Sequence, residues 1–108
     1  MSRREQFSVG TLTVGSDGTE LKQIKAYSAS LTPAAISAAD VAEEQQFTVT
    51  GVKAGDHVIA FTPPASMSAL VVAQCRVTAD DTVKIKFHAH TTATPTAGTY
   101  TVVVARPA

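Results

Sequence analysis

The most constraining feature of this sequence is a strict alternation of apolar and polar side chains near its C-terminal end. The stretch 83–88 reads VKIKFH, with apolar residues at odd positions and polar residues at even positions. Successive side chains of a β-strand point to opposite faces of a sheet. This pattern therefore predicts a strand with one buried and one solvated face, which requires a second layer of structure to cover its apolar side.

Short apolar or alternating runs of the same kind recur along the chain between clusters of turn-forming residues. The other predicted strands are residues 7–9, 11–14, 20–31, 45–50, 58–61, 70–77 and 100–104. Many of the intervals are the 8–12 residues typical of sandwiches and barrels. The sequence predicts an all-β fold, namely an antiparallel β-sandwich, either a jelly roll or an Ig-like Greek key, of about seven or eight short strands.

Two segments carry finer expectations. Residues 31–44 are rich in alanine, but Pro33 disfavours helix at the residue before it, so we expect a connection with at most one helical turn after Pro33. In residues 70–77, uninterrupted alternation would place Val71, Ala73, Cys75 and Val77 on one face and the intervening residues on the other.

The 108 residues fit one domain, which we expect to span residues 7–108 after a short polar N-terminal arm, residues 1–6. Hydrophobic residues make up 44% of the chain, enough for a real core, whereas only 17% are charged. The usual charged share is about a quarter. Such a low-charge surface suggests that part of it is buried against a partner.

Charge and hydropathy weigh against several partners. Nine Lys plus Arg balance nine Asp plus Glu, so the chain lacks the basic excess with which proteins bind nucleic acid. The first residues contain no apolar core typical of a signal peptide, and no apolar run approaches the ~18 residues that would cross a bilayer. With its single cysteine the chain has no internal disulfide. We expect a protein made in a cytoplasm that binds neither nucleic acid nor membrane.

His88 and His90 are the candidate metal ligands. They are two residues apart in a predicted strand, so both would face one side and could supply two ligands. No third ligand stands at a recognisable spacing, and the simpler interpretation is a polar strand face that runs into a loop. A variant remains, in which one histidine per chain completes a site on a threefold axis. We predict no metal or other cofactor.

No catalytic constellation is apparent. Cys75 lies in an apolar row, where a cysteine behaves as a small, inert hydrophobe. Asp80 and Asp81 fit a turn between two strands better than a calcium loop. Asp56 and His57 are adjacent and would point to opposite faces of a strand, unlike the converging side chains of a triad. We therefore expect that the chain is not an enzyme.

Over residues 31–106 the sequence resembles small β-rich virion proteins of tailed bacteriophages. The resemblance rests on "LTPA" at 31–34, "AEEQQFTVTGV" at 42–52, "GDHV" at 55–58, "CRVTADDTV" at 75–83 and "TPTAGTYTV" at 94–102. Cys75 stands where such proteins are expected to have a small residue. The resemblance implies a structural part of a phage particle, most simply a capsid decoration (cement) protein that forms homotrimers and holds neighbouring capsomers together. A tail, neck or head-fibre component is also compatible.

These observations lead to two hypotheses. In the first, the protein is assembled in a host cytoplasm into a virion, where it binds the major capsid protein or another virion protein as well as copies of itself. We expect the contacts in the arm, at Arg3 and Arg4, and in the loops 32–44 and 91–98, at the residues Pro33, Ile36, Thr92 and Pro95. In the second hypothesis the chain is a carbohydrate-binding or host-adhesion module. The absence of Trp and the position of most Phe and Tyr residues in apolar strand rows favour the first.

Overall fold

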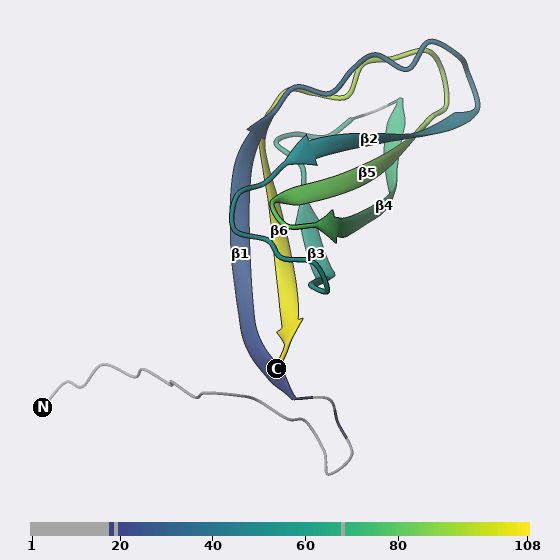
Figure 1. Ribbon diagram of the computed structural model, residues 1–108. Helices are drawn as coiled ribbons and strands as arrows, with labels where there is room; N and C mark the ends of the chain where they lie inside the picture. Colours follow the sequence, from purple (N-terminus) through teal and green to yellow (C-terminus); the bar gives the residue numbers. More distant parts are fainter. Residues whose placement is uncertain (1–17, 19, 68) are drawn as a thin grey trace, which may run out of the picture.

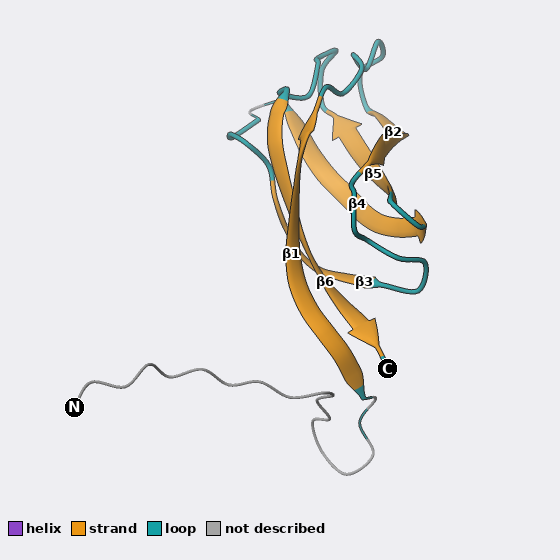
Figure 2. Ribbon diagram, turned by 60° about the vertical axis from the view of Figure 1, so that its left-hand side comes forward, coloured by secondary structure: helices purple, strands orange, loops and turns teal. Residues whose placement is uncertain are grey.

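The computed structural model describes residues 18, 20–67 and 69–108, which form six β-strands and contain no helix (Figures 1 and 2). No helix capable of crossing a membrane therefore occurs in this part of the chain. The strands are β1 (Leu21–Leu31), β2 (Val41–Thr48), β3 (His57–Thr62), β4 (Leu70–Ala79), β5 (Thr82–Ala89) and β6 (Gly98–Pro107). The all-β prediction is confirmed, but the described residues form six strands rather than seven or eight. The predicted arm and the predicted strands 7–9 and 11–14 lie outside them.

The strands make two antiparallel sheets of three. One has the order β1-β6-β3 and the other the order β2-β5-β4 (Figure 1). The first strand thus pairs with the last and the second with the fifth. Among the paired strands only β4 and β5 are consecutive in the chain, and a tight turn joins them. In that turn Asp81 adopts a left-handed conformation with φ of 58°. Aspartate tolerates this region better than most residues because its short side chain bonds locally to the backbone.

The two sheets share one hydrophobic core. Its centre is the apolar face of β5, where Val83, Ile85 and Phe87 have no exposed surface, as the alternating sequence predicts. Phe87 meets Phe47 of β2 edge to face, with ring centroids 6.5 Å apart. From the other sheet, Tyr100 enters the same core cluster. The alternation in residues 83–88 therefore belongs to a central strand whose apolar face is covered by the core and whose polar face is not covered.

β1 and β6 extend well beyond the second sheet (Figures 1 and 2). Where the sheets overlap, Tyr27 and Ala29 of β1 pack against the core. On the opposite face of the same strand Ile24 is 51% exposed. The long strand pair thus has a side that faces away from the second sheet, and this side includes a large, exposed apolar residue.

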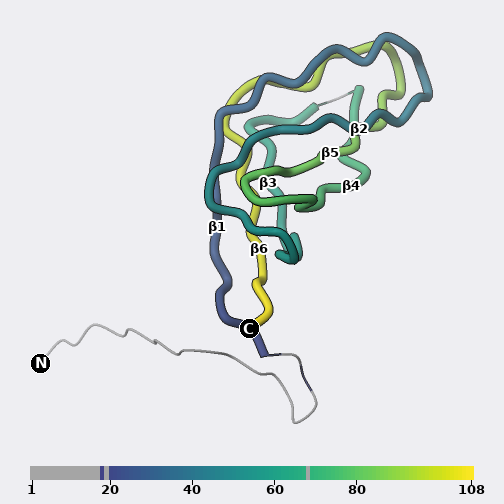
Figure 3. Tube along the Cα trace, viewed as in Figure 1, coloured from purple at the N-terminus to yellow at the C-terminus, as the bar shows by residue number. Residues whose placement is uncertain are grey.

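The connection predicted for residues 31–44 is too long. It contains no helical turn after Pro33, which the prediction allowed, but β2 already begins at Val41, whose Cα faces that of Ala89 in β5. Pairing with the central strand overrides the weak strand propensity of this Ala- and Glu-rich stretch. The rest of the segment runs beside the loop between β5 and β6 (Figure 3), and the two are tied by a β-bridge between Ile36 and Ala93.

The predicted faces of β4 are also wrong, because the strand is bulged. Between Val72 and Gln74 the pairing with β5 shifts by one residue, which leaves Ala73 as the extra residue. A bulge of this kind inverts the alternation for the rest of a strand. As a result Val72 and Cys75 lie on the same, inward-facing side of β4, packed against the core.

Candidate functional site

The two histidines that could bind a metal have no third ligand beside them within the described residues. His88 is half-buried on β5, with Cα partners Ala42 and Val71 in the neighbouring strands. His90 follows the end of β5 and is exposed, and its Nδ1 lies 3.7 Å from Oδ1 of Asp40. Within the described residues no group of three His, Cys, Asp or Glu side chains is placed to hold a metal ion.

Cys75 is half-buried at the gap between β3 and β4 and has no disulfide partner. Burial raises the pKa of its thiol to about 11. A thiol with this pKa stays protonated at neutral pH, and the thiolate is the nucleophilic form. Cys75 therefore acts as an apolar wall residue in this structure.

The strongest polar interaction joins Asp56, just before β3, to Arg106, at the end of β6. Arg106 donates from Nε to Asp56 Oδ1 at 2.8 Å and from a terminal nitrogen to Oδ2 at 2.9 Å. The Asp56 side chain is fully buried, whereas that of Arg106 is 19% exposed. Two parallel bonds between a guanidinium and a carboxylate form a strong, directional pair.

The surroundings of Asp56 complete its hydrogen bonding. The backbone N–H of Lys53 also donates to Oδ2, at 2.9 Å, and Arg106 donates to the carbonyl of Gly51 at 3.1 Å. The Arg106 guanidinium holds the pKa of the Asp56 carboxyl below its usual value, against the opposing effect of burial. Because the carboxylate is ionised and already accepts three bonds, it fixes the 51–56 turn to β6 and is poorly placed to accept a substrate proton.

Gly51 is required at the centre of this arrangement. Its φ is +109°, and a Cβ added there would collide with the Tyr27 ring. Its N–H donates to Asp81 Oδ1 at 2.8 Å, so the turn between β2 and β3 is also tied to the β4–β5 turn. Only a residue without a side chain fits these contacts and this backbone conformation, which explains why glycine stands here.

The Asp56–Arg106 pair was not predicted from the sequence. Asp56 stands next to His57 in the chain, whereas its true partner lies 50 residues further along. The sequence offers one hint of this pair, namely that each residue is a charge next to a predicted strand. No spacing along the sequence reveals that the two residues meet, since their contact depends on the pairing of β3 with β6.

The residues predicted to contact partners differ in how far they are exposed. Pro33, Ile36 and Pro95 are buried within the chain, and Ile36 is only 1% exposed. The two loops that hold them bury these side chains against their own domain, which leaves little of them for a partner. Thr92 is exposed, and Arg3 and Arg4 lie outside the described residues.

The outer face of the β2-β5-β4 sheet is charged. Lys84 and Lys86 project from β5 between Glu44 of β2 and Arg76 of β4. Arg76 reaches across the central strand to Glu44, with which it forms two hydrogen bonds of 3.0 Å. This hydrogen bonding lowers the pKa of Glu44. The face thus carries charges of both signs, and Val71 of β4 is also 59% exposed on it.

The outer face of the β1-β6-β3 sheet carries no Lys, Arg, Asp or Glu along its described pairs. The register sets Ile24 opposite Ala105, Ala26 opposite Val103 and Ser28 opposite Thr101, whose hydroxyls are 2.8 Å apart. We call this surface the uncharged face; its members are Ile24, Ala26, Ser28, Ser30, His57, Ile59, Ala60, Thr62, Thr99, Thr101, Val103 and Ala105. Ile59, the extra residue of a bulge in β3, is 56% exposed at one edge of the face.

Comparison with known proteins adds no relative. The chain matches no family model, no curated protein and no solved structure.

Proposed function

We propose that this chain is a structural protein of a bacteriophage virion, most simply a capsid decoration protein. In this role it associates with copies of itself, as a homotrimer, and binds the major capsid protein on the outer shell. The chain works by holding neighbouring subunits together, without catalysis and without a cofactor. Its site of action is the virion, after assembly in the host cytoplasm.

The observation that carries this proposal is the uncharged face. A sheet face that stays in water usually carries charged or strongly polar side chains, as the other sheet does. Here small, uncharged side chains surround Ile24, and a flat surface of this kind suits contact with another protein surface. The sequence resemblance to phage virion proteins gives the partner class.

The strand order supports a finer description of the fold. First-with-last and second-with-fifth pairing is what results when a ribbon of antiparallel strands wraps into two layers. We infer a jelly-roll sandwich with three described strands per sheet, rather than an Ig-like Greek key. Jelly rolls are common in viral capsid proteins, although they also occur in lectins and enzymes, so the topology supports the proposal without carrying it.

The mechanism follows from multivalency. Each subunit contributes a modest interface, and an oligomer that engages several shell sites at once gains avidity without any new kind of contact. A protein that binds only the assembled shell also stabilises that shell by mass action. Decoration would therefore raise the resistance of the particle to heat or to loss of divalent ions.

The carbohydrate-binding alternative is less well supported by the described aromatic residues. Tyr27, Phe47 and Phe61 are half-buried against the core, and Phe87 and Tyr100 are buried in it. Sugar-binding sites usually present an exposed ring on which a sugar can stack. In the described part no aromatic side chain is among the large exposed ones.

The test mixes full-length protein with capsid shells assembled without it. The expected result is stoichiometric co-sedimentation, together with a higher temperature of shell disruption. Binding to isolated tails but not to shells would move the protein to the tail or neck. Binding to a glycan array with no binding to either particle would replace the proposal with a host-adhesion role.

A further inference from the structure

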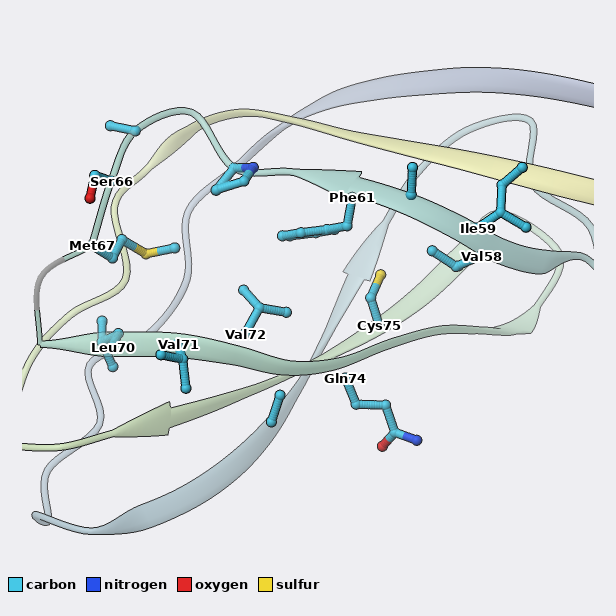
Figure 4. A pocket seen from close by; sticks show the side chains of 14 residues that line it. Val58, Ile59, Phe61, Ser66, Met67, Leu70, Val71, Val72, Gln74 and Cys75 are labelled. Atoms are coloured by element: carbon cyan, nitrogen blue, oxygen red, sulfur yellow. The ribbon is translucent and has the colours of Figure 1, made fainter.

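A second surface lies beside the uncharged face, in the open gap between β3 and β4. These two strands are the outermost described strands of their sheets on this side, and each pairs with only one neighbour there. They form the walls of a groove of about 600 Å³ (Figure 4). None of the fourteen lining residues is charged, and its apolar members include Val58, Phe61, Met67, Leu70, Val72 and Cys75.

The groove offers both parts of a strand-binding site. Phe61 points into it from β3, and Val72 and Cys75 point into it from β4 (Figure 4). The backbone of an outermost strand has N–H and C=O groups free to pair with an added strand. Peptides recognised in this way gain affinity from main-chain hydrogen bonds and specificity from alternate side chains that enter pockets.

The bulge in β4 gives the apolar side of this strand an unusual spacing. Its inward residues are Leu70, Val72, Cys75 and Val77, at intervals of two, three and two. The intervals repeat in residues 7–14, FSVGTLTV, where the apolar residues are Phe7, Val9, Leu12 and Val14. Gly10 stands inside the three-residue interval, and glycine is favoured at strand bulges. This segment, like the groove, contains no charged residue.

We propose that residues 7–14 of a neighbouring copy add to β4 as an antiparallel strand and fill the groove. The inference rests on the self-association in the proposed function. Because both strands have the same palindromic spacing, they pair residue for residue without a further bulge. Every strand pair in the described sheets is antiparallel, and in that direction Val9 faces Cys75 and Leu12 faces Val72.

The position at which the chain enters β1 favours a neighbour over the chain's own groove. The N–H of Ala108 donates to the carbonyl of Glu20 at 3.0 Å, so residue 20 still follows the end of β6. The groove lies at the opposite edge of the sheet, beyond both β6 and β3. To reach it in the same chain, residues 15–20, which span at most about 20 Å, would have to reverse and pass around the 51–56 turn. A reversal at the Gly-rich stretch 15–18 would instead bring the segment beside β1.

The size of the uncharged face also calls for an additional contact. Three strands ~4.8 Å apart and ~20 Å long present about 300 Å². A stable protein interface buries about 800 Å² on each partner. An exchanged strand adds its own buried area next to this face, and a head-to-tail exchange closes into a ring when three copies each give one segment and receive one.

The single native cysteine makes the test specific. In full-length protein carrying Val9→Cys, mild oxidation at alkaline pH, where a larger share of the thiols is ionised, should join Cys75 of one copy to the new cysteine of the next and yield covalent trimers on a non-reducing gel. Ser8→Cys is the matched control, because its side chain would point away from the groove and should link at least about tenfold less. Adding Cys75→Ala to the Val9→Cys variant should abolish the trimers.

Three results would overturn the inference. A disulfide within one chain would place the segment in its own groove. Equal linking by Ser8→Cys and Val9→Cys would indicate random collision. Hydrogen exchange in wild-type protein that slows along β1 but not along β4 on self-association would place the segment beside β1. No shell is present in these experiments, so covalent trimers that fail to bind shells would contradict the proposed function and leave the strand exchange standing.

Discussion

The two sheets of this protein place their charges on opposite sides. The β2-β5-β4 sheet displays the Arg76–Glu44 pair on its outer face in water, whereas the β1-β6-β3 sheet holds the Asp56–Arg106 pair on its inner side, largely buried. The paired residues on the outer face of the latter sheet include no Lys, Arg, Asp or Glu, and Ile24 and Ile59 are exposed there. The same backbone geometry thus supports one face suited to solvent and one suited to a protein partner.

Because of this contrast, we expect different residues to determine the stability of the fold and the self-association of the chain. The buried pair ties the 51–56 turn to the last strand and should matter for folding. The uncharged face contributes little inside the chain and should matter for contact with other subunits. The exposed pair on the other sheet should matter little for either.

The largest expected effect is that of removing the buried carboxylate. Asp56→Ala leaves the Arg106 guanidinium without its partner and should lower the free energy of unfolding by roughly 3 kcal/mol, the lower end of what breaking a buried pair costs. Urea unfolding of full-length protein measures it. Asp80→Ala is the control, because this carboxylate is exposed, where it accepts the Ala54 N–H at 3.0 Å and lies 3.9 Å from Lys53. A cost for Asp56→Ala no greater than that of the control would show that the buried pair does not stabilise the fold.

The same pair predicts a loss of stability in acid. Since the pKa of Asp56 is lower in the folded chain than in the unfolded chain, its contribution is fully present above pH ~4 and declines as pH falls through the folded value. The difference in unfolding free energy between wild type and Asp56→Asn should therefore shrink below pH 4. A difference that stays constant from pH 7 to pH 2 would rule out this linkage.

A single lysine tests the contrast between the two outer faces. Ala26 and Ala42 are both exposed, the first on the uncharged face and the second on the charged face. Ala26→Lys should weaken self-association at least about tenfold, because a charge would be buried at the contact. Ala42→Lys should leave it unchanged. Sedimentation equilibrium compares the two, and equal effects of the two variants would remove the uncharged face as the interface.

The smallest effect is expected from the exposed pair. Glu44→Gln removes the charge that Arg76 contacts, but the Arg76 side chain is 51% exposed and water replaces the lost interaction. Thermal unfolding should stay close to that of wild type, and so should self-association. Destabilisation comparable to that of Asp56→Ala would mean that the outer pair also holds its sheet together.

Local pattern predicted much of this fold. The strand class and the buried face of β5 both follow from a period of two, which depends only on neighbouring residues. The uncharged face also needs the pairing of β1 with β6 and of β6 with β3, which joins side chains from three distant segments into one surface.

The failures all involve contacts between distant segments. The bulge at Ala73 turned Val71 outward and put Val72 on the inner side with Cys75, because a bulge depends on how β4 pairs with β5. Strand β2 begins at Val41 for the same reason, and Ile36 is buried because its loop bridges to Ala93. None of these pairings leaves a local signature in a single sequence.

Hydroxyl-radical footprinting of the full-length protein, diluted and self-associated, tests the central claim most directly. It reports the solvent access of individual side chains on both outer faces in one experiment. The account predicts strong protection of Ile24 and Val103 on self-association, with His88 on the charged face reacting as before. Unchanged reactivity of Ile24 and Val103, together with protection of His88, would contradict it.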